Sequence, residues 1–289
     1  MDEKAWQDLF LLYVIVLGAC IGSFLNVVIA RVPIGESVVK PRSKCPKCEA
    51  SIAWYDNIPI ISYLALLARC RNCKVHIPVR YPLVEVLMAA LAGAIWVKFG
   101  YSWNFAIWLP LSSALVAISF IDIDHFLIPD IIVFPMICFV GAAVLLPGGI
   151  TPLGAVVGLL PALLIYGVGW GFERLTGQEG LGFGDVKLLA LLGMAMGLQP
   201  ALNILLLASI QGAIIGMILR VFSSDAEQEG VTPTEVEEGT GEEEEWVPPP
   251  HAIPFGPFLV LGAFQVLLLP GDLANLAKHL NELIGNQLM

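Results

Sequence analysis

The chain has 289 residues, of which 57% are hydrophobic and only 14% are charged. This apolar content, with a mean hydropathy of +0.80, exceeds what the core of a soluble protein needs and is typical of a polytopic membrane protein. The formal charge of −10 belongs to one segment, because residues 223–250 hold ten acidic side chains and no lysine or arginine. The remainder is balanced and contains no nucleic-acid-binding motif, so a nucleic-acid-binding class is excluded.

The first apolar stretch runs from Leu9 to Ala30 behind a mostly acidic N-terminus. A secretory signal would begin with basic residues and end at a small-residue cleavage site, so we expect a retained membrane span. Gly18 and Gly22 lie four residues apart within it, which predicts close contact with another helix. Cys20 also lies in this stretch, and Cys138 lies in a later one; we expect both side chains to be buried by packing.

Seven further apolar stretches follow, several of them shorter than the ~20 residues of a perpendicular span. They cover residues 82–97, 104–121, 131–147, 152–172, 186–199, 201–219 and 254–270. We therefore predict an all-α polytopic membrane protein with about eight transmembrane helices and a small cytoplasmic zinc-ribbon-like domain.

Basic residues predict the orientation of these helices. Nine of the fifteen lysines and arginines lie in residues 31–80, so the positive-inside rule places this segment in the cytoplasm and the N-terminus outside. Eight spans then bring two acidic clusters, residues 122–130 and 173–185, to the cytoplasmic side. The location predicted is a membrane, with lipid as a partner.

The sequence divides into five parts. We expect a first transmembrane helix at 1–30, a cytoplasmic zinc-binding domain at 31–80, and a transmembrane core at 81–222. An acidic, disordered loop at 223–250 then precedes a last span and an amphipathic segment at 251–289, with a surface helix over 271–289.

Two Cys-x-x-Cys pairs lie in the polar segment, at Cys45/Cys48 and Cys70/Cys73. Facing a reducing compartment, this spacing predicts a four-thiolate zinc site that fastens a segment too small to fold on its own core. A separate redox role for each pair is the alternative.

Acidic residues interrupt the apolar sequence at two places that carry the candidate chemistry. Asp185 follows Gly182 and Gly184 and precedes an apolar run, while Asp122 lies in the earlier cluster. Two carboxylates held close together cannot both ionise easily, so one can accept a proton from water while the other donates one. This predicts an aspartyl protease site, against the alternative that each aspartate only caps a helix.

Neighbouring residues offer supporting or rival roles. Asp124 competes with Asp122, and His125 is either a hydrogen-bond donor to the pair or an ordinary interfacial residue. Asp130 follows Pro129 at the start of an apolar run, which is typical of an N-cap or supporting residue. Lys187 either holds a nearby carboxylate ionised or extends to the membrane surface.

Taken together, these motifs resemble the type IV prepilin leader peptidase family, and the resemblance covers nearly the whole chain. They are, in order, Gly22-Ser23-Phe24-Leu25-Asn26-Val27-Val28 with Arg31 and Pro33, both cysteine pairs, Trp54-Tyr55-Asp56-Asn57-Ile58-Pro59, Ser62-Tyr63-Leu64, Arg80-Tyr81-Pro82 with Glu85, residues 121–130, Gly182-Phe183-Gly184-Asp185-Val186-Lys187 and Ile253-Pro254-Phe255-Gly256-Pro257-Phe258.

The resemblance implies cleavage of a basic leader from prepilins and pseudopilins at the cytoplasmic membrane face. It matches Asp185 to the aspartate of Gly-x-Gly-Asp and Asp122 to the one seven residues before Pro129, which favours Asp122 over Asp124 by analogy. It also implies N-methylation of the new N-terminus with S-adenosylmethionine, for which the sequence reveals no binding residues. The oligomeric state is not predicted.

Two other classes compete with this interpretation. A transporter would use intramembrane carboxylates to relay ions or protons, but it predicts acidic residues spread across the membrane depth. A noncatalytic, zinc-fastened membrane scaffold would need neither aspartate. The acidic segment at 223–250 either attracts basic leaders or is a tolerated insertion.

Overall fold

The computed structural model describes residues 3–146, 150–177, 182–223 and 253–269, and these ranges contain helices but no strand. The helices are α1 Glu3–Arg31, η1 Trp54–Asn57, α2 Ile61–Ala65, α3 Arg80–Phe99, α4 Trp103–His125, α5 Asp130–Ala143, α6 Pro152–Gly158, α7 Leu160–Thr176, α8 Phe183–Met196, α9 Leu198–Ser223 and α10 Gly256–Leu268. The all-α prediction is confirmed for this part of the chain.

Among the residues that the structure describes, five helical stretches could cross a membrane by length and composition. They are α1, α3, α4, the joined α6 and α7, and α9. Except for Ser223, the acidic segment at 223–250 lies outside the described residues, as does the surface helix over 271–289. The burial expected for Cys20 and Cys138 is wrong: both side chains are exposed on the outer surface of apolar helices.

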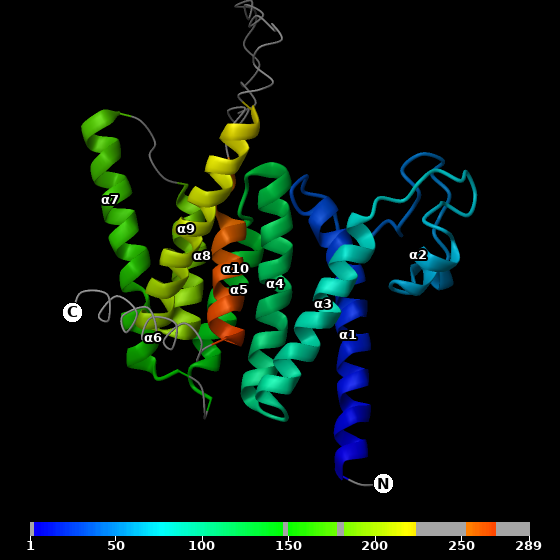
Figure 1. Cartoon of the computed structure of the whole chain (residues 1–289), viewed down its shortest axis with the longest axis horizontal. Coiled ribbons are helices and arrows are strands. Elements are labelled where there is room, and N and C mark those ends of the chain that lie inside the picture. The colour runs from blue at the N-terminus through cyan, green and yellow to red at the C-terminus, as the bar shows by residue number, and fades with distance from the viewer. Residues whose placement is uncertain (1–2, 147–149, 178–181, 224–252, 270–289) are drawn as a thin grey trace, which may run out of the picture.

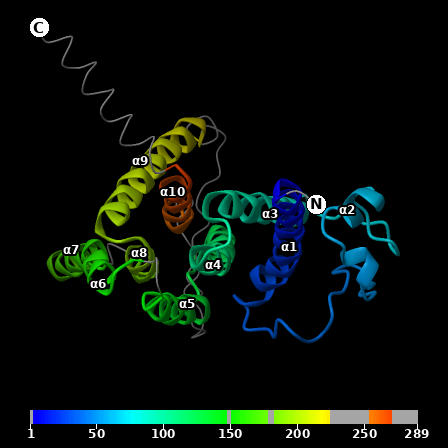
Figure 2. The same cartoon turned by 90° about the horizontal axis from the view of Figure 1, so that it is seen from below.

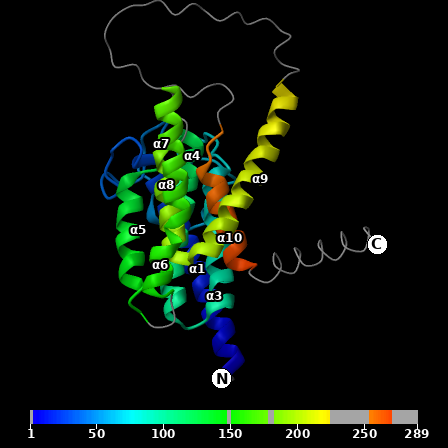
Figure 3. The ribbon, with the colours of Figure 1, turned by 90° about the vertical axis from the view of Figure 1, so that its left-hand side faces the viewer.

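The long helices lie side by side, as Figure 1 shows. α1 and α3 form one side of the bundle, α4 lies beside them, and α5 to α10 form the other side, an arrangement also seen from below in Figure 2. The cysteine-bearing segment, which runs from Cys45 to Cys73, lies beside the C-terminal end of α1. In Figures 1 and 3, α4 ends, α8 begins and α10 begins at this same end of the bundle.

Two glycines bring α1 and α3 into backbone contact. A methyl group on Gly18 would lie 2.6 Å from the Cβ of Ala92, and one on Gly22 would lie 2.7 Å from the Cα of Glu85. Real side chains do not approach this closely, so both positions require glycine. The close helix contact predicted from these two residues is confirmed.

The apolar stretch predicted as one span at 152–172 remains one candidate span, Pro152–Thr176, but it is interrupted at Leu159. α6 ends at Gly158 and α7 begins at Leu160, because Pro161 lacks the N–H that would continue the helical hydrogen bonds. The backbones of Gly158 and Gly193 touch here, since a methyl group on Gly158 would lie 2.0 Å from the Gly193 carbonyl oxygen. This contact fixes α8 against α6.

Candidate active site

Asp122 lies near the C-terminal end of α4, next to the fully buried Ile121. Its side chain is only 5% exposed. Its Oδ2 atom accepts a hydrogen bond of 3.0 Å from the backbone N–H of Gly256, the first residue of α10. Because N–H groups at the start of a helix lack partners within the helix, this donor stabilises an ionised carboxylate.

Gly256 is a site residue that sequence reasoning missed. A methyl group on it would lie 2.5 Å from Oδ2 of Asp122 and 3.3 Å from Cδ1 of Ile128. Only glycine lets the backbone come this close to the carboxylate. The available signal was the Pro254-Phe255-Gly256-Pro257 run, whose two prolines fix the backbone around one glycine at the start of an apolar stretch.

Asp185 lies in the first turn of α8 and is partly exposed. The N-cap position belongs to Gly182, and no side-chain cap bond forms there, so capping does not explain Asp185. The carboxylate folds back toward Gly182, on which a methyl group would lie 3.2 Å from Oδ2 of Asp185. Gly184 in turn allows Ile128 to approach, because a methyl group there would lie 3.0 Å from its Cβ.

The structure brings Asp122 and Asp185 together. The two carboxylates lie within the range of direct electrostatic repulsion. Ile128 connects their surroundings, since it packs against Gly184 on one side and Gly256 on the other. Two acidic groups from α4 and α8, 63 positions apart in the sequence, therefore share one half-buried site.

Asp124 is directed elsewhere. Its Oδ2 atom lies 2.5 Å from a guanidinium nitrogen of Arg80, and the two side chains are 30% and 35% exposed respectively. Residues two apart on a helix point about 200° from each other, so Asp124 faces α3 while Asp122 faces α10. His125 is exposed at the last residue of α4.

Asp130 and Lys187 form an ion pair between α5 and α8. The N-cap expected at Asp130 is wrong, because Pro129 occupies the cap position and Asp130 is the first helical residue. The Lys187 side chain is only 15% exposed and its ammonium lies 5.2 Å from the centre of the Phe183 ring. Of the two roles expected for Lys187, the structure shows the pairing with a carboxylate, although the partner is Asp130 and not Asp185.

The four cysteines lie on two turns with the same backbone pattern. The N–H of Cys45 donates to the carbonyl of Ala50, and the N–H of Cys70 donates to Val75, the residue at the same spacing. In each turn the residue after the second cysteine has a positive φ, 54° at Glu49 and 58° at Lys74. Isolated antiparallel bridges close both turns, Lys44 with Ser51 and Arg69 with His76.

The sulfur positions fit a metal ion. All four Sγ atoms lie within 4.8 Å of one another, and those of Cys45 and Cys73 are 3.7 Å apart. A tetrahedral ion with metal–sulfur bonds of about 2.3 Å would hold its sulfurs about 3.8 Å apart. N–H groups from the Ala50 backbone and the Asn72 side chain lower the pKa of Cys48 to about 6, whereas burial and the neighbouring thiols raise the pKa of Cys73 to about 11.

Comparison with known proteins agrees with this division of sites. Residues 16–99, which contain the four cysteines, match the model of the bacterial peptidase A24 N-terminal domain. Residues 109–217, which contain both aspartates, match the model of the type IV leader peptidase family. A prepilin leader peptidase/N-methyltransferase from Myxococcus xanthus is 40% identical, with 90% of each chain covered.

The chain belongs to the type IV leader peptidase family. Other members of the family that match it include prepilin leader peptidase/N-methyltransferases from Stutzerimonas stutzeri and Neisseria gonorrhoeae, each 37% identical. The first aligns over 91% of both chains, and the second over 71% of this chain and 81% of its own. No solved structure matches the chain. The family resemblance recognised from the sequence motifs is confirmed.

Proposed function

We propose that this protein is a membrane aspartyl endopeptidase that removes the basic leader peptide from type IV prepilins and type II secretion pseudopilins. Family membership and the similarity to named prepilin leader peptidase/N-methyltransferases support this activity. The observation that carries the proposal is the convergence of Asp122 and Asp185 in one half-buried site at one end of the helical bundle.

The pair can hydrolyse a peptide bond without a metal or a covalent intermediate. The ionised carboxylate takes a proton from water, and the water oxygen attacks the carbonyl carbon to form a tetrahedral intermediate. The protonated carboxylic acid then gives its proton to the amide nitrogen as the C–N bond breaks. Because Gly256 donates a hydrogen bond to Asp122, we assign the ionised role to Asp122 and the protonated role to Asp185.

The supporting residues keep this pair in place. Gly182 and Gly184 allow the close packing around Asp185, and the Asp130–Lys187 pair fastens α8 to α5 two residues further along α8. Asp124 supports the site through its ion pair with Arg80 rather than through contact with water at the aspartates.

We further propose that the protein N-methylates the new N-terminal residue. The names of its relatives support this second activity. S-adenosylmethionine would supply the methyl group, and no residue of the described chain is assigned to bind it. The matched N-terminal domain at 16–99 makes residues 31–80 the segment in which to look for that site.

Zinc is the metal we propose for the four cysteines, in a small zinc-ribbon-like domain over residues 31–80. Four thiolates at tetrahedral spacing suit zinc, and the ion would crosslink two turns that share little apolar packing. Its role there is structural, because the cysteines use all four coordination positions.

Eight spans with the N-terminus outside remain our proposal for the topology in the bacterial inner membrane. The order of the helices supports it, since successive long helices run in alternating directions in Figures 1 and 3. Arginine and lysine residues concentrate at the end that carries the cysteines, which places the aspartates at the cytoplasmic face. A transporter is disfavoured because both carboxylates lie at one depth of the bundle.

A cleavage assay tests the proposal. The full chain, purified in detergent with phospholipid, is incubated with a prepilin peptide with and without S-adenosylmethionine, and products are identified by mass spectrometry. We expect the wild type to release the leader and Asp122→Asn and Asp185→Asn each to lose at least about 100-fold in rate. Asp8→Asn, which alters an exposed carboxylate near the opposite end of α1, is the matched control. Wild-type cleavage by both site variants would exclude the aspartyl mechanism.

A further inference from the structure

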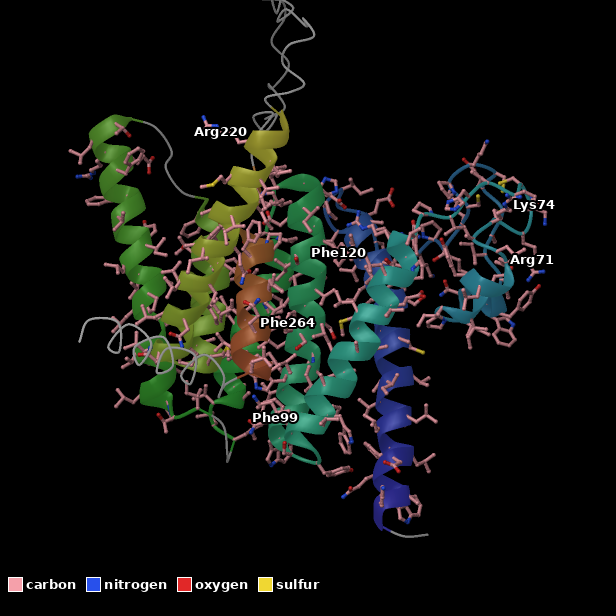
Figure 4. The ribbon with its side chains drawn as sticks, in the orientation of Figure 1. Arg71, Lys74, Phe99, Phe120, Arg220 and Phe264 are labelled. Atoms are coloured by element: carbon pink, nitrogen blue, oxygen red, sulfur yellow. The ribbon has the colours of Figure 1, made fainter. Side chains whose placement is uncertain are left out.

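Arg80 joins the start of α3 to the last turn of α4. One guanidinium nitrogen donates a hydrogen bond of 3.2 Å to the carbonyl oxygen of Phe120, and another lies 2.5 Å from Oδ2 of Asp124. The guanidinium also lies over the Phe120 ring, 5.1 Å from its centre. Figure 4 shows Phe120 on the side of α4 that faces α3.

The two attachment points lie on either side of Asp122 in the sequence. Phe120 precedes it by two residues and Asp124 follows it by two, so they share one face of α4 and Asp122 lies on the opposite face. On that opposite face, the N–H of Gly256 holds the Asp122 carboxylate. The last turn of α4 is therefore held from both sides, by α3 and by α10.

Such a hold matters because Asp122 is close to a helix end. α4 stops at His125, three residues later, where Phe126 adopts a left-handed conformation with φ of 52°. Helix ends fray, and a side chain that ties the end of one helix to a neighbouring helix limits this fraying. Hydrolysis by two carboxylates requires them to stay on opposite sides of one water molecule, and small displacements of a reacting group are costly.

We propose that Arg80 is a positioning residue for peptide cleavage, which holds the last turn of α4 so that Asp122 stays opposite Asp185. This inference rests on the proposed peptidase function. Arginine suits the task because its planar guanidinium reaches the Phe120 carbonyl and the Asp124 carboxylate at the same time, whereas a lysine ammonium is a single point charge.

The same end of α3 also holds the cysteine-bearing segment. Glu85 is buried, and its Oε2 atom accepts a hydrogen bond of 2.7 Å from the N–H of Ile60. Arg80 and Glu85 lie five residues apart in the first half of α3. Glu85 binds the cysteine-bearing segment, and Arg80 binds the end of α4 that contains Asp122. The hydrogen bond, ion pair and ring contact of Arg80 described above are all with α4, so its substitution should leave the metal content of the segment unchanged.

Steady-state cleavage of a prepilin peptide by the purified full chain tests the proposal. We expect Arg80→Gln to lower kcat about tenfold while KM stays within about twofold, because substrate binding does not use this contact. Arg80→Lys should recover part of the loss. Asp124→Asn should also lower kcat, and the double variant should lose no more than the worse single variant, as expected for one shared interaction.

Arg220→Gln is the matched control, since Arg220 is an exposed arginine near the end of α9 (Figure 4). Its kcat, together with the unfolding midpoint and metal content of every variant, should equal the wild-type values. Wild-type kcat in Arg80→Gln would overturn the proposal. If Arg80→Gln lowers the unfolding midpoint, Asp124→Asn decides, and an unchanged kcat there would overturn it as well. An inactive wild type would instead overturn the proposed peptidase function.

Discussion

The contact between Gly256 and Asp122 allows a sharp test of the site. In Gly256→Ala the new methyl group would lie 2.5 Å from Oδ2 of Asp122, well inside van der Waals contact. Either the carboxylate or the start of α10 must move, and the hydrogen bond of 3.0 Å from the Gly256 N–H is lengthened or lost. Hydrogen bonds to charged groups contribute about 1.5–3 kcal/mol, which corresponds to about 10- to 150-fold in rate.

We therefore expect Gly256→Ala to lower kcat/KM for peptide cleavage by about 10- to 150-fold. Overpacking should also lower the free energy of unfolding by about 1–3 kcal/mol. Gly141→Ala on α5 is the control, because a methyl group there meets nothing within 4 Å, and it should match the wild type in both measurements. Cleavage within twofold of the wild type by a folded Gly256→Ala would refute the reasoning.

Two further changes test other contacts. Cys48→Ser should lose the metal, as measured by elemental analysis, and residues 43–77 of this variant should become sensitive to limited proteolysis. The control is Cys138→Ser, which changes an exposed cysteine and should bind as much metal as the wild type. Gly22→Ala would place a methyl group 2.7 Å from the Cα of Glu85 and should lower the thermal unfolding midpoint. Gly167→Ala is the control, because a methyl group there meets nothing within 4 Å, and it should leave the midpoint unchanged. Equal midpoints for the two variants would show that α1 and α3 do not need their close approach.

Hydrophobic runs predicted the long helices well, because lipid requires every backbone group of a span to be bonded within its own helix. They did not predict where the span over α6 and α7 is interrupted. The interruption comes from Pro161 and from the backbone contact of Gly158 with Gly193, a residue 35 positions away that hydropathy cannot see.

The candidate site was predictable where chemistry leaves a local mark. Asp122 and Asp185 are charges in apolar surroundings, and the cysteine spacing identifies its own cluster. The contacts that each site residue makes were not predictable, because these contacts depend on which helices pack against each other. Asp130 had the sequence context of a cap but pairs with Lys187, and Gly256 acts through a backbone N–H that no side-chain pattern reports.

In a membrane protein, an apolar stretch of sequence does not predict that its side chains are buried inside the protein. Cys20 and Cys138 lie in apolar runs and are nevertheless exposed, because the outside of a membrane protein is as apolar as its interior. Hydropathy identifies the helix in which such a cysteine lies but not the side of the helix to which its thiol points.

The duplicated cysteine turns have a consequence for how the ion is captured. Each turn orients its own two sulfurs through its own backbone hydrogen bonds. Each turn is therefore a bidentate ligand that does not depend on the other. An ion held by one turn would meet the second turn at a high effective concentration, because only the 21 residues between Cys48 and Cys70 separate them. The Ile60 N–H within this ring donates to the buried Glu85 of α3, so an ion that closed the ring would also stabilise the docking of this segment on the membrane helices.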